Sequence, residues 1–226
     1  MKLAALFSGG KDSTFAIYQA KKEGHDVVCL VTIFPFSDES QLLHYPNLSM
    51  TKLQAQSMKL PQLSSHIIYD DTKIELSELE FLLVQAKQVF GIEGLVHGGI
   101  LSEFQKNHFD DTCKKLNLKI ISPLWGMDQK EYMKKLIELK FKYIITSVSS
   151  DGLDDSWLGR EITTTDVDIL ENLSIKHGFN LSFEGGEAES LVLNCPLFVS
   201  ELKIIKSNKT WDGYRGRFEI TEAILQ

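Results

Sequence analysis

The sequence predicts an α/β fold: a doubly wound parallel sheet with a second, smaller mixed α/β domain. Apolar, strand-like runs alternate with helix-like segments through the first half of the chain, which is typical of βαβ units. After Pro123 this alternation gives way to glycine-rich and β-like segments that continue to the C-terminus. We therefore expect two domains, residues 1–124 and residues 125–226, which pack closely because no low-complexity linker separates them.

The first half contains the expected strands and helices of the parallel sheet in order. Residues 3–7 are an apolar run, and residues 27–33 are a continuous run rich in β-branched residues, as buried parallel strands are. The expected elements are a strand over 3–7, a helix over 13–23 before Gly24, a strand over 27–33, a helix over 49–59 ended by Pro61, a strand over 66–69, a helix over 75–90 ended by Gly91 and a strand over 94–97.

The second half is expected to contain a helix over 130–139, a strand over 143–148 and a helix over 167–177 before its β-like segments. In doubly wound sheets, ligands bind beyond the carboxyl ends of the strands. The loop after the first strand and the turn at Gly98-Gly99 are therefore expected to border the same crevice.

The loop between the first strand and the first helix has the composition of a phosphate cradle. It consists of Ser8-Gly9-Gly10-Lys11-Asp12-Ser13. The two glycines allow backbone N–H groups to face an anion, and the helix N-terminus that follows adds its dipole. Lys11 is expected to supply a mobile positive charge from this surface loop, and the serine hydroxyls donate hydrogen bonds. Because Asp12 follows Lys11 and the Walker A spacing is absent, the motif does not indicate a kinase or a GTPase.

Composition narrows the classes of partner. The chain has a formal net charge of -7 and no basic run longer than two residues, so a nucleic-acid partner is not expected. No stretch is long and apolar enough to cross a bilayer, and we expect a cytoplasmic location without membrane binding. Cys29, Cys113 and Cys195 are widely spaced and odd in number, which indicates neither a disulfide framework nor a metal or redox pair. The expected metal is Mg²⁺ that arrives with ATP.

The phosphate loop resembles the SGGxDS loop of the PP-loop ATP pyrophosphatase superfamily, and blocks along the whole chain resemble the diphthine-ammonia ligase family. These blocks are, in order, 96–105 (VHGGILSEFQ), 123–125 (PLW), 128–129 (DQ), 152–153 (GL), 158–159 (LG), 184–193 (EGGEAESLVL) and 195–198 (CPLF). Ala188 and the segment 106–108 differ from the usual family residues. The chain length, without an appended domain, resembles an archaeal form.

The resemblance implies a fold and a reaction. The fold is of the HUP-like, adenine nucleotide alpha hydrolase-like type. ATP activates the carboxylate of diphthine, a modified histidine of translation elongation factor 2, with release of pyrophosphate. Ammonia then attacks the acyl-adenylate and gives the amide diphthamide and AMP.

The chemistry and the resemblance together give a set of candidate site residues. ATP is expected to contact Ser8, Gly9, Gly10, Lys11, Asp12, Ser13, His44 and Gly98; the acceptor is expected to contact Ser102, Glu103, Gln105, Trp125, Glu184 and Glu189; Lys11, Asp12 and Glu187 are the candidate catalytic residues, and Asp12 is the candidate Mg²⁺ ligand. Several have plainer alternatives: Asp12 caps the loop, His44 is a surface histidine, Ser102 is a helix N-cap, Trp125 wedges the two domains together, and the three glutamates form a solvated acidic turn.

The expected partners are elongation factor 2 in its diphthine form and ammonium, with the oligomeric state open and a homodimer as one alternative. Two other function classes also stay open. The first is another AMP-forming PP-loop enzyme, such as a tRNA thiolase or an amidotransferase-coupled synthetase. Thiolases generally need sulfur-handling cysteines and a basic RNA surface, and neither is visible in this sequence. The second is a non-catalytic nucleotide sensor, which would bind ATP without turnover.

Overall fold

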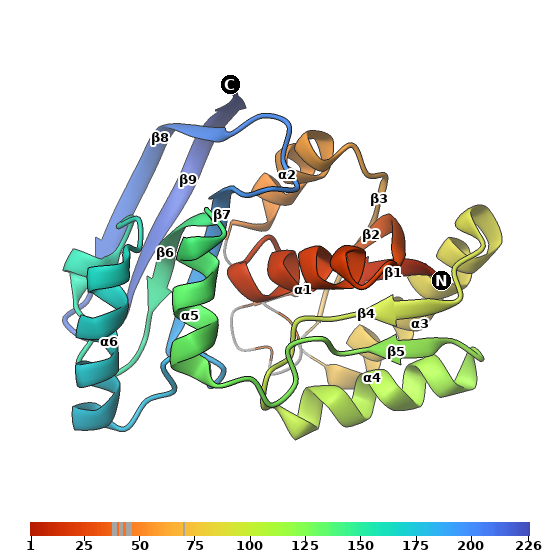
Figure 1. Ribbon diagram of the computed structural model, residues 1–226, viewed down its shortest axis with the longest axis horizontal. Helices are drawn as coiled ribbons and strands as arrows, with labels where there is room; N and C mark the ends of the chain where they lie inside the picture. The colour runs from red at the N-terminus through yellow and green to blue at the C-terminus, as the bar shows by residue number, and fades with distance from the viewer. Residues whose placement is uncertain (38–39, 41–42, 44–46, 70) are drawn as a thin grey trace.

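The computed structural model describes residues 1–37, 40, 43, 47–69 and 71–226. The molecule contains two β-sheets, and helix α1 lies between them (Figure 1). The first sheet and its helices come from the N-terminal half, and the second sheet comes from the C-terminal half. The expected α/β class is confirmed.

The first sheet has five parallel strands in the order β3-β2-β1-β4-β5. Its strands are β1 (Lys2–Leu6), β2 (Asp26–Phe34), β3 (Gln62–His66), β4 (Gly94–Val96) and β5 (Lys119–Ile121), and its helices are α1 (Lys11–Lys22), α2 (Thr51–Met58), α3 (Thr72–Phe90) and α4 (Glu103–Lys115). The strand order reverses between β1 and β4, so the loops after these two strands lie at the switch point where such sheets bind ligands.

Side chains of β1 alternate between the two faces of this sheet. Leu3 and Ala5 pack in one apolar core with residues of α1 and α2, and Ala4 packs in the other core with residues of α3 and α4. A strand buried on both faces has no polar side, which explains why β1 and β2 are continuous apolar runs in the sequence. The doubly wound arrangement is therefore confirmed.

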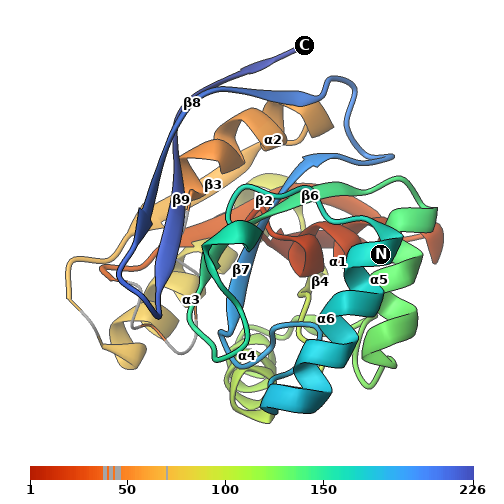
Figure 2. The ribbon, with the colours of Figure 1, turned by 90° about the vertical axis from the view of Figure 1, so that its left-hand side faces the viewer.

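The second half adds an antiparallel sheet in the order β7-β6-β9-β8. Its elements are α5 (Gln129–Glu138), β6 (Lys142–Val148), α6 (Thr164–His177), β7 (Ala188–Asn194), β8 (Leu202–Trp211) and β9 (Gly216–Leu225), with short 3-10 turns at Asp155–Trp157 and, in the first half, Leu48–Met50. In Figure 2 the long β8–β9 hairpin runs past α2, and α5 and α6 stand side by side.

One expected strand is wrong. A strand was expected over residues 66–69, whereas β3 ends at His66. It begins at Gln62 and pairs with β2 from Leu30↔Gln62 to Phe34↔His66. Among the described strands, β3 lies at the edge of the sheet and pairs with β2 only. Its side chains are partly or fully exposed, so its sequence QLSSH lacks the apolar run that marks a central strand.

The two halves share one hydrophobic core. Phe15 of α1 packs against Tyr132 of α5 and against Phe141, with ring centroids 5.5 Å apart in both pairs. The same core includes Leu3 of β1 and Val192 of β7. The expected domain boundary near residue 124 thus falls between parts that pack through a continuous apolar interior, and it stays a prediction. Among the described residues, no helix is long and apolar enough to span a membrane.

Candidate active site

The predicted phosphate loop connects β1 to α1 at the switch point of the parallel sheet. Gly10 is the N-cap of α1, which begins at Lys11, and Gly9 has a positive φ of 81°. A Cβ at Gly9 would lie 2.3 Å from Oε1 of Gln54, and a Cβ at Gly98 would lie 2.5 Å from the backbone carbon of Asp12. Both positions therefore favour glycine: Gly9 because of its positive φ and the contact with Gln54, and Gly98 because a side chain would collide with the backbone at Asp12.

Strand β7 of the second sheet forms hydrogen bonds with this loop. The backbone N–H of Val192 donates to the carbonyl of Gly9 at 3.0 Å, and the hydroxyl of Ser190 accepts from the backbone N–H of Lys11 at 3.2 Å. The buried amide of Gln54 donates to the carbonyls of both Gly9 and Val192. The C-terminal half thus fixes the shape of the loop.

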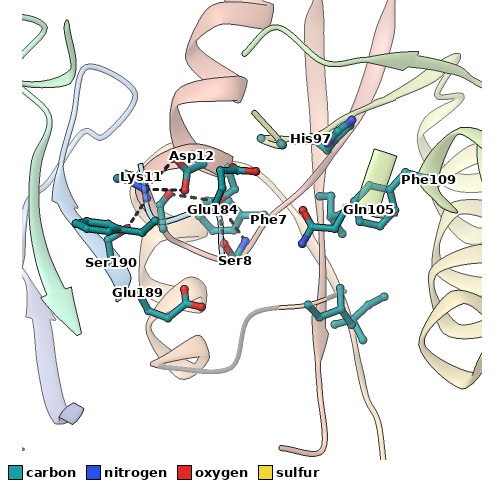
Figure 3. A pocket seen from close by; sticks show the side chains of 18 of the residues that line it. Phe7, Ser8, Lys11, Asp12, His97, Gln105, Phe109, Glu184, Glu189 and Ser190 are labelled. Carbon is teal, nitrogen blue, oxygen red and sulfur yellow. Dashed lines mark hydrogen bonds and ion pairs between the residues drawn. The ribbon is translucent and has the colours of Figure 1, made fainter. Parts of the chain in front are cut away.

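An open hollow lies over the loop (Figure 3). Its walls come from the ends of β1 and β2, the N-terminus of α1, the turn after β4, helix α4 and the segment before β7. The lining residues are Leu6, Phe7, Ser8, Gly10, Lys11, Asp12, Ser13, Ile33, Leu43, His97, Gly98, Gly99, Gln105, Phe109, Phe183, Glu184, Ala188, Glu189 and Ser190.

Several charged and hydroxyl groups gather on one side of the hollow, called here its polar side. Figure 3 shows Lys11, Asp12 and Glu184 close together on one side, and Gln105 and Phe109 across the hollow from them. The N-terminus of α1 and the hydroxyls of Ser8 and Ser13 lie on the polar side. Backbone N–H groups, hydroxyls and an ammonium are the donor set that binds phosphates, so this side fits the triphosphate of ATP.

Lys11 is held in place, which corrects the expectation of a mobile charge on a surface loop. Its side chain is only 2% exposed. The ammonium donates to the carbonyl of Ser182 at 2.6 Å and to both carboxylate oxygens of Asp12 at 3.0 Å. It also lies 5.3 Å from the centre of the Phe183 ring. The segment 182–183 of the second half covers the lysine, and no sequence pattern indicates that contact.

Asp12 is fixed from two directions. Besides Lys11, the fully buried Tyr132 of α5 donates its hydroxyl to Oδ1 of Asp12 at 2.6 Å. Burial, followed by the charge of Asp12, raises the pKa of Tyr132 well above its usual value, so the hydroxyl stays protonated and donates. The Asp12 side chain remains 28% exposed toward the hollow.

Glu184 brings a second carboxylate into the hollow. Its two oxygens accept from the backbone N–H groups of Ile100 and Leu101, both at 3.2 Å. Burial and the nearby charge of Asp12 raise the pKa of Glu184 above its usual value. These bonds tie the acidic segment before β7 to the turn after β4.

His97 is a buried wall residue that had no assigned role. Its Nδ1 accepts from the backbone N–H of Gly99 at 3.1 Å, so Nε2 carries the proton and donates to the hydroxyl of Ser122 at 2.7 Å. Burial lowers the pKa of His97 to about 4. The imidazole is therefore neutral near pH 7, and it shapes the turn at Gly98-Gly99.

Nine of the predicted site residues line one hollow. They are Ser8, Gly10, Lys11, Asp12, Ser13, Gly98, Gln105, Glu184 and Glu189. Gly9 lies directly behind this wall, where Gln54 contacts it. His44 lies outside the described residues. Four other predicted residues are not among the lining residues: Ser102, Glu103, Trp125 and Glu187.

Glu187 closes a turn beside the hollow. Oε1 accepts from the backbone N–H and the side-chain amide of Asn180 at 2.8 and 2.9 Å, and Oε2 accepts from the backbone N–H of Gly185 at 2.8 Å. The carboxylate oxygens thus both take part in bonds within the turn. This geometry favours a structural role, and the expected catalytic role of Glu187 stays a prediction.

Ser102 has a contact that matches its plainer alternative, whereas both roles considered for Trp125 stay predictions. The hydroxyl of Ser102 accepts from the backbone N–H of Gln105 at 3.4 Å, as a helix N-cap does. The Trp125 ring is 37% exposed, and the ammonium of Lys106 lies 5.5 Å from its centre. Glu103 is exposed in the first turn of α4.

The three cysteines are free and buried. Burial raises the pKa of each thiol to about 12, so none is a ready nucleophile. Cys29 is a core residue of β2, as expected for a strand residue.

Comparison of the whole chain with known families decides between the PP-loop alternatives. The diphthamide synthase N-terminal domain matches residues 1–120, and the diphthamide synthase C-terminal domain matches residues 128–225. The chain belongs to the diphthamide synthase family. The two matches together include the phosphate loop, the turn after β4, and the acidic segment of the second half.

The similarity to relatives in the diphthamide synthase family covers nearly the whole chain. Diphthine–ammonia ligase of Mus musculus is 34% identical over 92% of this chain and 84% of its own length, and the Homo sapiens protein is 33% identical over the same shares. The Schizosaccharomyces pombe protein is 32% identical over 88% of this chain and 35% of its own length. A predicted subunit of a tRNA methyltransferase from Methanocaldococcus jannaschii is a distant structural likeness, at 15% identity and a TM-score of 0.42, and carries no functional conclusion.

Sequence reasoning missed contacts that depend on the packing of the two halves. Tyr132 and Ser182 hold the Lys11–Asp12 pair, and Gln54 holds the loop. Tyr132 lies on the apolar face of a helix and is indistinguishable there from a core tyrosine. For His97, the sequence offered one signal of a role at the site: it directly precedes the two glycines of a family-like block.

Proposed function

We propose that this chain is an AMP-forming ligase that amidates the diphthine carboxylate of translation elongation factor 2 with ammonia. The observation that carries the proposal is the shared hollow: the phosphate-binding loop of the first half and the acidic segment of the second half line the same cavity. Membership in the diphthamide synthase family supports the choice of acceptor. ATP, ammonium and the acceptor carboxylate are the three substrates.

The residues of the hollow have separate roles in this reaction. The loop N–H groups and Lys11 bind the β- and γ-phosphates and stabilise the charge that develops as pyrophosphate leaves. The acceptor carboxylate attacks the α-phosphate and forms an acyl-adenylate. Ammonia then attacks the acyl carbon, loses a proton, and releases AMP. We expect the cationic trimethylammonium group of the acceptor to bind beside Glu184 and Glu189, which line the hollow.

Mg²⁺ is the metal that such a nucleotide site would use, and Asp12 is the residue that would hold it together with phosphate oxygens. The carboxylate fits this role because it lies at the phosphate loop, pairs with Lys11 and is partly exposed to the hollow. Bound Mg²⁺ would neutralise phosphate charge during cleavage. Lys11 and Tyr132 orient the carboxylate from the protein side.

The decisive experiment supplies the purified protein with ATP, Mg²⁺, ammonium and diphthine-bearing elongation factor 2. We expect AMP and pyrophosphate in equal amounts, and a mass decrease of the factor that corresponds to replacement of a hydroxyl by an amine. Stoichiometric ADP and phosphate would contradict the PP-loop chemistry. ATP binding without turnover would favour a sensor, and AMP formation that requires tRNA would favour an RNA-modifying enzyme.

Cellular context follows from this reaction. Elongation factor 2 works in translation, so a cytoplasmic location is proposed. Free ammonium is the proposed nitrogen source, and no nucleic-acid or membrane partner is needed.

A further inference from the structure

Helix α5 of the second half reaches the Lys11–Asp12 pair by two routes. Tyr132 donates its hydroxyl directly to Asp12 at 2.6 Å. Gln129 acts through an intermediary: its Oε1 accepts from the backbone N–H of Ser182 at 2.8 Å and from the Ser182 hydroxyl at 3.1 Å. The carbonyl of Ser182 in turn accepts from the Lys11 ammonium at 2.6 Å.

The two residues of α5 that make these contacts are three positions apart. Residues at this spacing lie next to each other on the same face of a helix. One rigid face of α5 therefore fixes both members of the pair, Lys11 through Ser182 and Asp12 through the tyrosine hydroxyl. The packing of Phe15 against Tyr132 keeps α5 beside α1, and Figure 1 shows the two helices as neighbours.

Without these contacts, the pair would have fewer constraints on its geometry. Lys11 and Asp12 bind each other through both carboxylate oxygens, and such a pair can rotate as a unit. Tyr132 fixes Oδ1 of the carboxylate, and Ser182 fixes the ammonium. Groups that stabilise a developing charge contribute most when they are already oriented before the reaction, because no reorganisation is then needed.

We propose that Tyr132 and Gln129 are positioning residues that orient the Lys11–Asp12 pair for ATP cleavage, so that α5 of the second half completes the catalytic site of the first. This inference rests on the proposed function. It assigns a purpose to two residues that do not line the hollow.

The chain offers a matched control for Tyr132. Tyr143 is also fully buried, and its hydroxyl donates to the sulfur of Met133 at 3.8 Å, without a hydrogen bond to the Lys11–Asp12 pair. Tyr132→Phe and Tyr143→Phe each remove one buried hydroxyl from the same core. A merely structural contribution would lower the melting temperature of both variants and leave the turnover of both at a similar level.

The test measures kcat and the KM for ATP during AMP formation with diphthine-bearing elongation factor 2 and ammonium, together with the melting temperature. We expect Tyr132→Phe to lose roughly 10- to 100-fold in kcat with a KM within about threefold of wild type, since orientation matters most in the transition state. Tyr143→Phe should keep kcat within about twofold. Equal kcat values in the two variants would overturn the inference.

A second variant tests the route through Ser182. Gln129→Met keeps the length of the side chain and removes the acceptor for Ser182, and we expect it to lower kcat as well. The double variant with Tyr132→Phe should lose less than the product of the two single losses, because both residues act on one pair. Independent, fully multiplicative losses would overturn the shared role. Absence of AMP formation by the wild-type protein would instead overturn the proposed function, and this inference with it.

Discussion

Lys11 carries the only ammonium that the structure places in the described wall of the hollow, and the fold buries it almost completely. A buried cation is tolerated when carboxylate and carbonyl oxygens replace its water shell, and Asp12 and Ser182 do this. Desolvation also strengthens the attraction between Lys11 and a phosphate, because the surrounding dielectric is low. The position that makes the lysine effective therefore also makes it part of the folded core.

Replacement of Lys11 should reduce both turnover and stability. We expect Lys11→Ala to lose roughly 10² to 10³ in AMP formation, the scale of one oriented charge-stabilising donor. Because the variant leaves the Ser182 carbonyl and Asp12 without their partner, it should also lose about 1 to 3 kcal/mol of unfolding free energy. Lys11→Met is the matched control for the lost side-chain volume. Turnover within about threefold of wild type in either folded variant would contradict the role of Lys11.

Glu187 is the residue for which the structure offers a plainer role than the sequence did. Its carboxylate accepts three hydrogen bonds inside the turn, and an amide would present two donors to groups that also donate. We therefore expect Glu187→Gln to lower the unfolding free energy by about 1 to 3 kcal/mol, measured by chemical denaturation. A variant of wild-type stability with strongly reduced amide formation would instead support the catalytic role predicted from the sequence.

His97 should make stability depend on pH. Burial lowers its pKa from 6.5 to about 4, so between these values the unfolded chain binds a proton that the folded chain does not. Stability should therefore fall as the pH falls from 6.5 toward 4, with a slope of up to about 1.4 kcal/mol per pH unit from this group. Denaturation of His97→Gln across this range should show a smaller slope than wild type.

At the scale of elements, local signals in the sequence predict the helices well. The glycine after α3 has a positive φ of 66°, and Ser102 caps α4 through the backbone N–H of Gln105. The central strands β1 and β2 were predictable because they are apolar on both faces. Edge strand β3 was not predictable, because one of its edges has no neighbouring strand in the described part of the chain and its sequence is mostly polar.

The N-cap of α4 allows a separate test of that element. Ser102→Ala should lower the unfolding free energy by about 1 kcal/mol, because one N–H at the start of the helix loses its acceptor. Turnover should stay within about threefold, since Ser102 is not a lining residue. Ser102→Asn keeps an acceptor and should restore most of the stability. A large loss of turnover at unchanged stability would return Ser102 to the substrate site.

At the scale of the whole molecule, the sequence predicts which loops lie close together but not which side chains form hydrogen bonds between the two halves. The doubly wound pattern placed the loop of Lys11 and the turn at Gly98 at one crevice, the family resemblance added Glu184, and all three line the hollow. The bonds of Tyr132, Ser182 and Gln54 join residues more than 40 positions apart, and they depend on the docking of two sheets. Such contacts leave no local pattern in a single sequence. The boundary at residue 124 divides the shared core and stays a prediction.

The net charge of the whole protein also bears on how it recognises its acceptor. A net charge of -7 gives little long-range attraction for RNA, so recognition should depend on the hollow itself. There Asp12, Glu184 and Glu189 outnumber the single ammonium of Lys11, which Asp12 already neutralises. A hollow with excess negative charge favours a ligand that offers a fixed cation beside the carboxylate to be activated.

Binding of elongation factor 2 should therefore depend on its modification. Titration of the diphthine-bearing factor should give a clearly lower Kd than titration of the unmodified factor, because the trimethylammonium group supplies the cation that the glutamates attract. With ammonium present, only the diphthine-bearing factor should stimulate AMP formation. Raised salt should weaken this preference less than it would weaken a surface ion pair, since Glu184 is largely buried. Equal stimulation by both forms, or stronger stimulation by tRNA, would contradict the choice of acceptor and leave the ATP site unaffected.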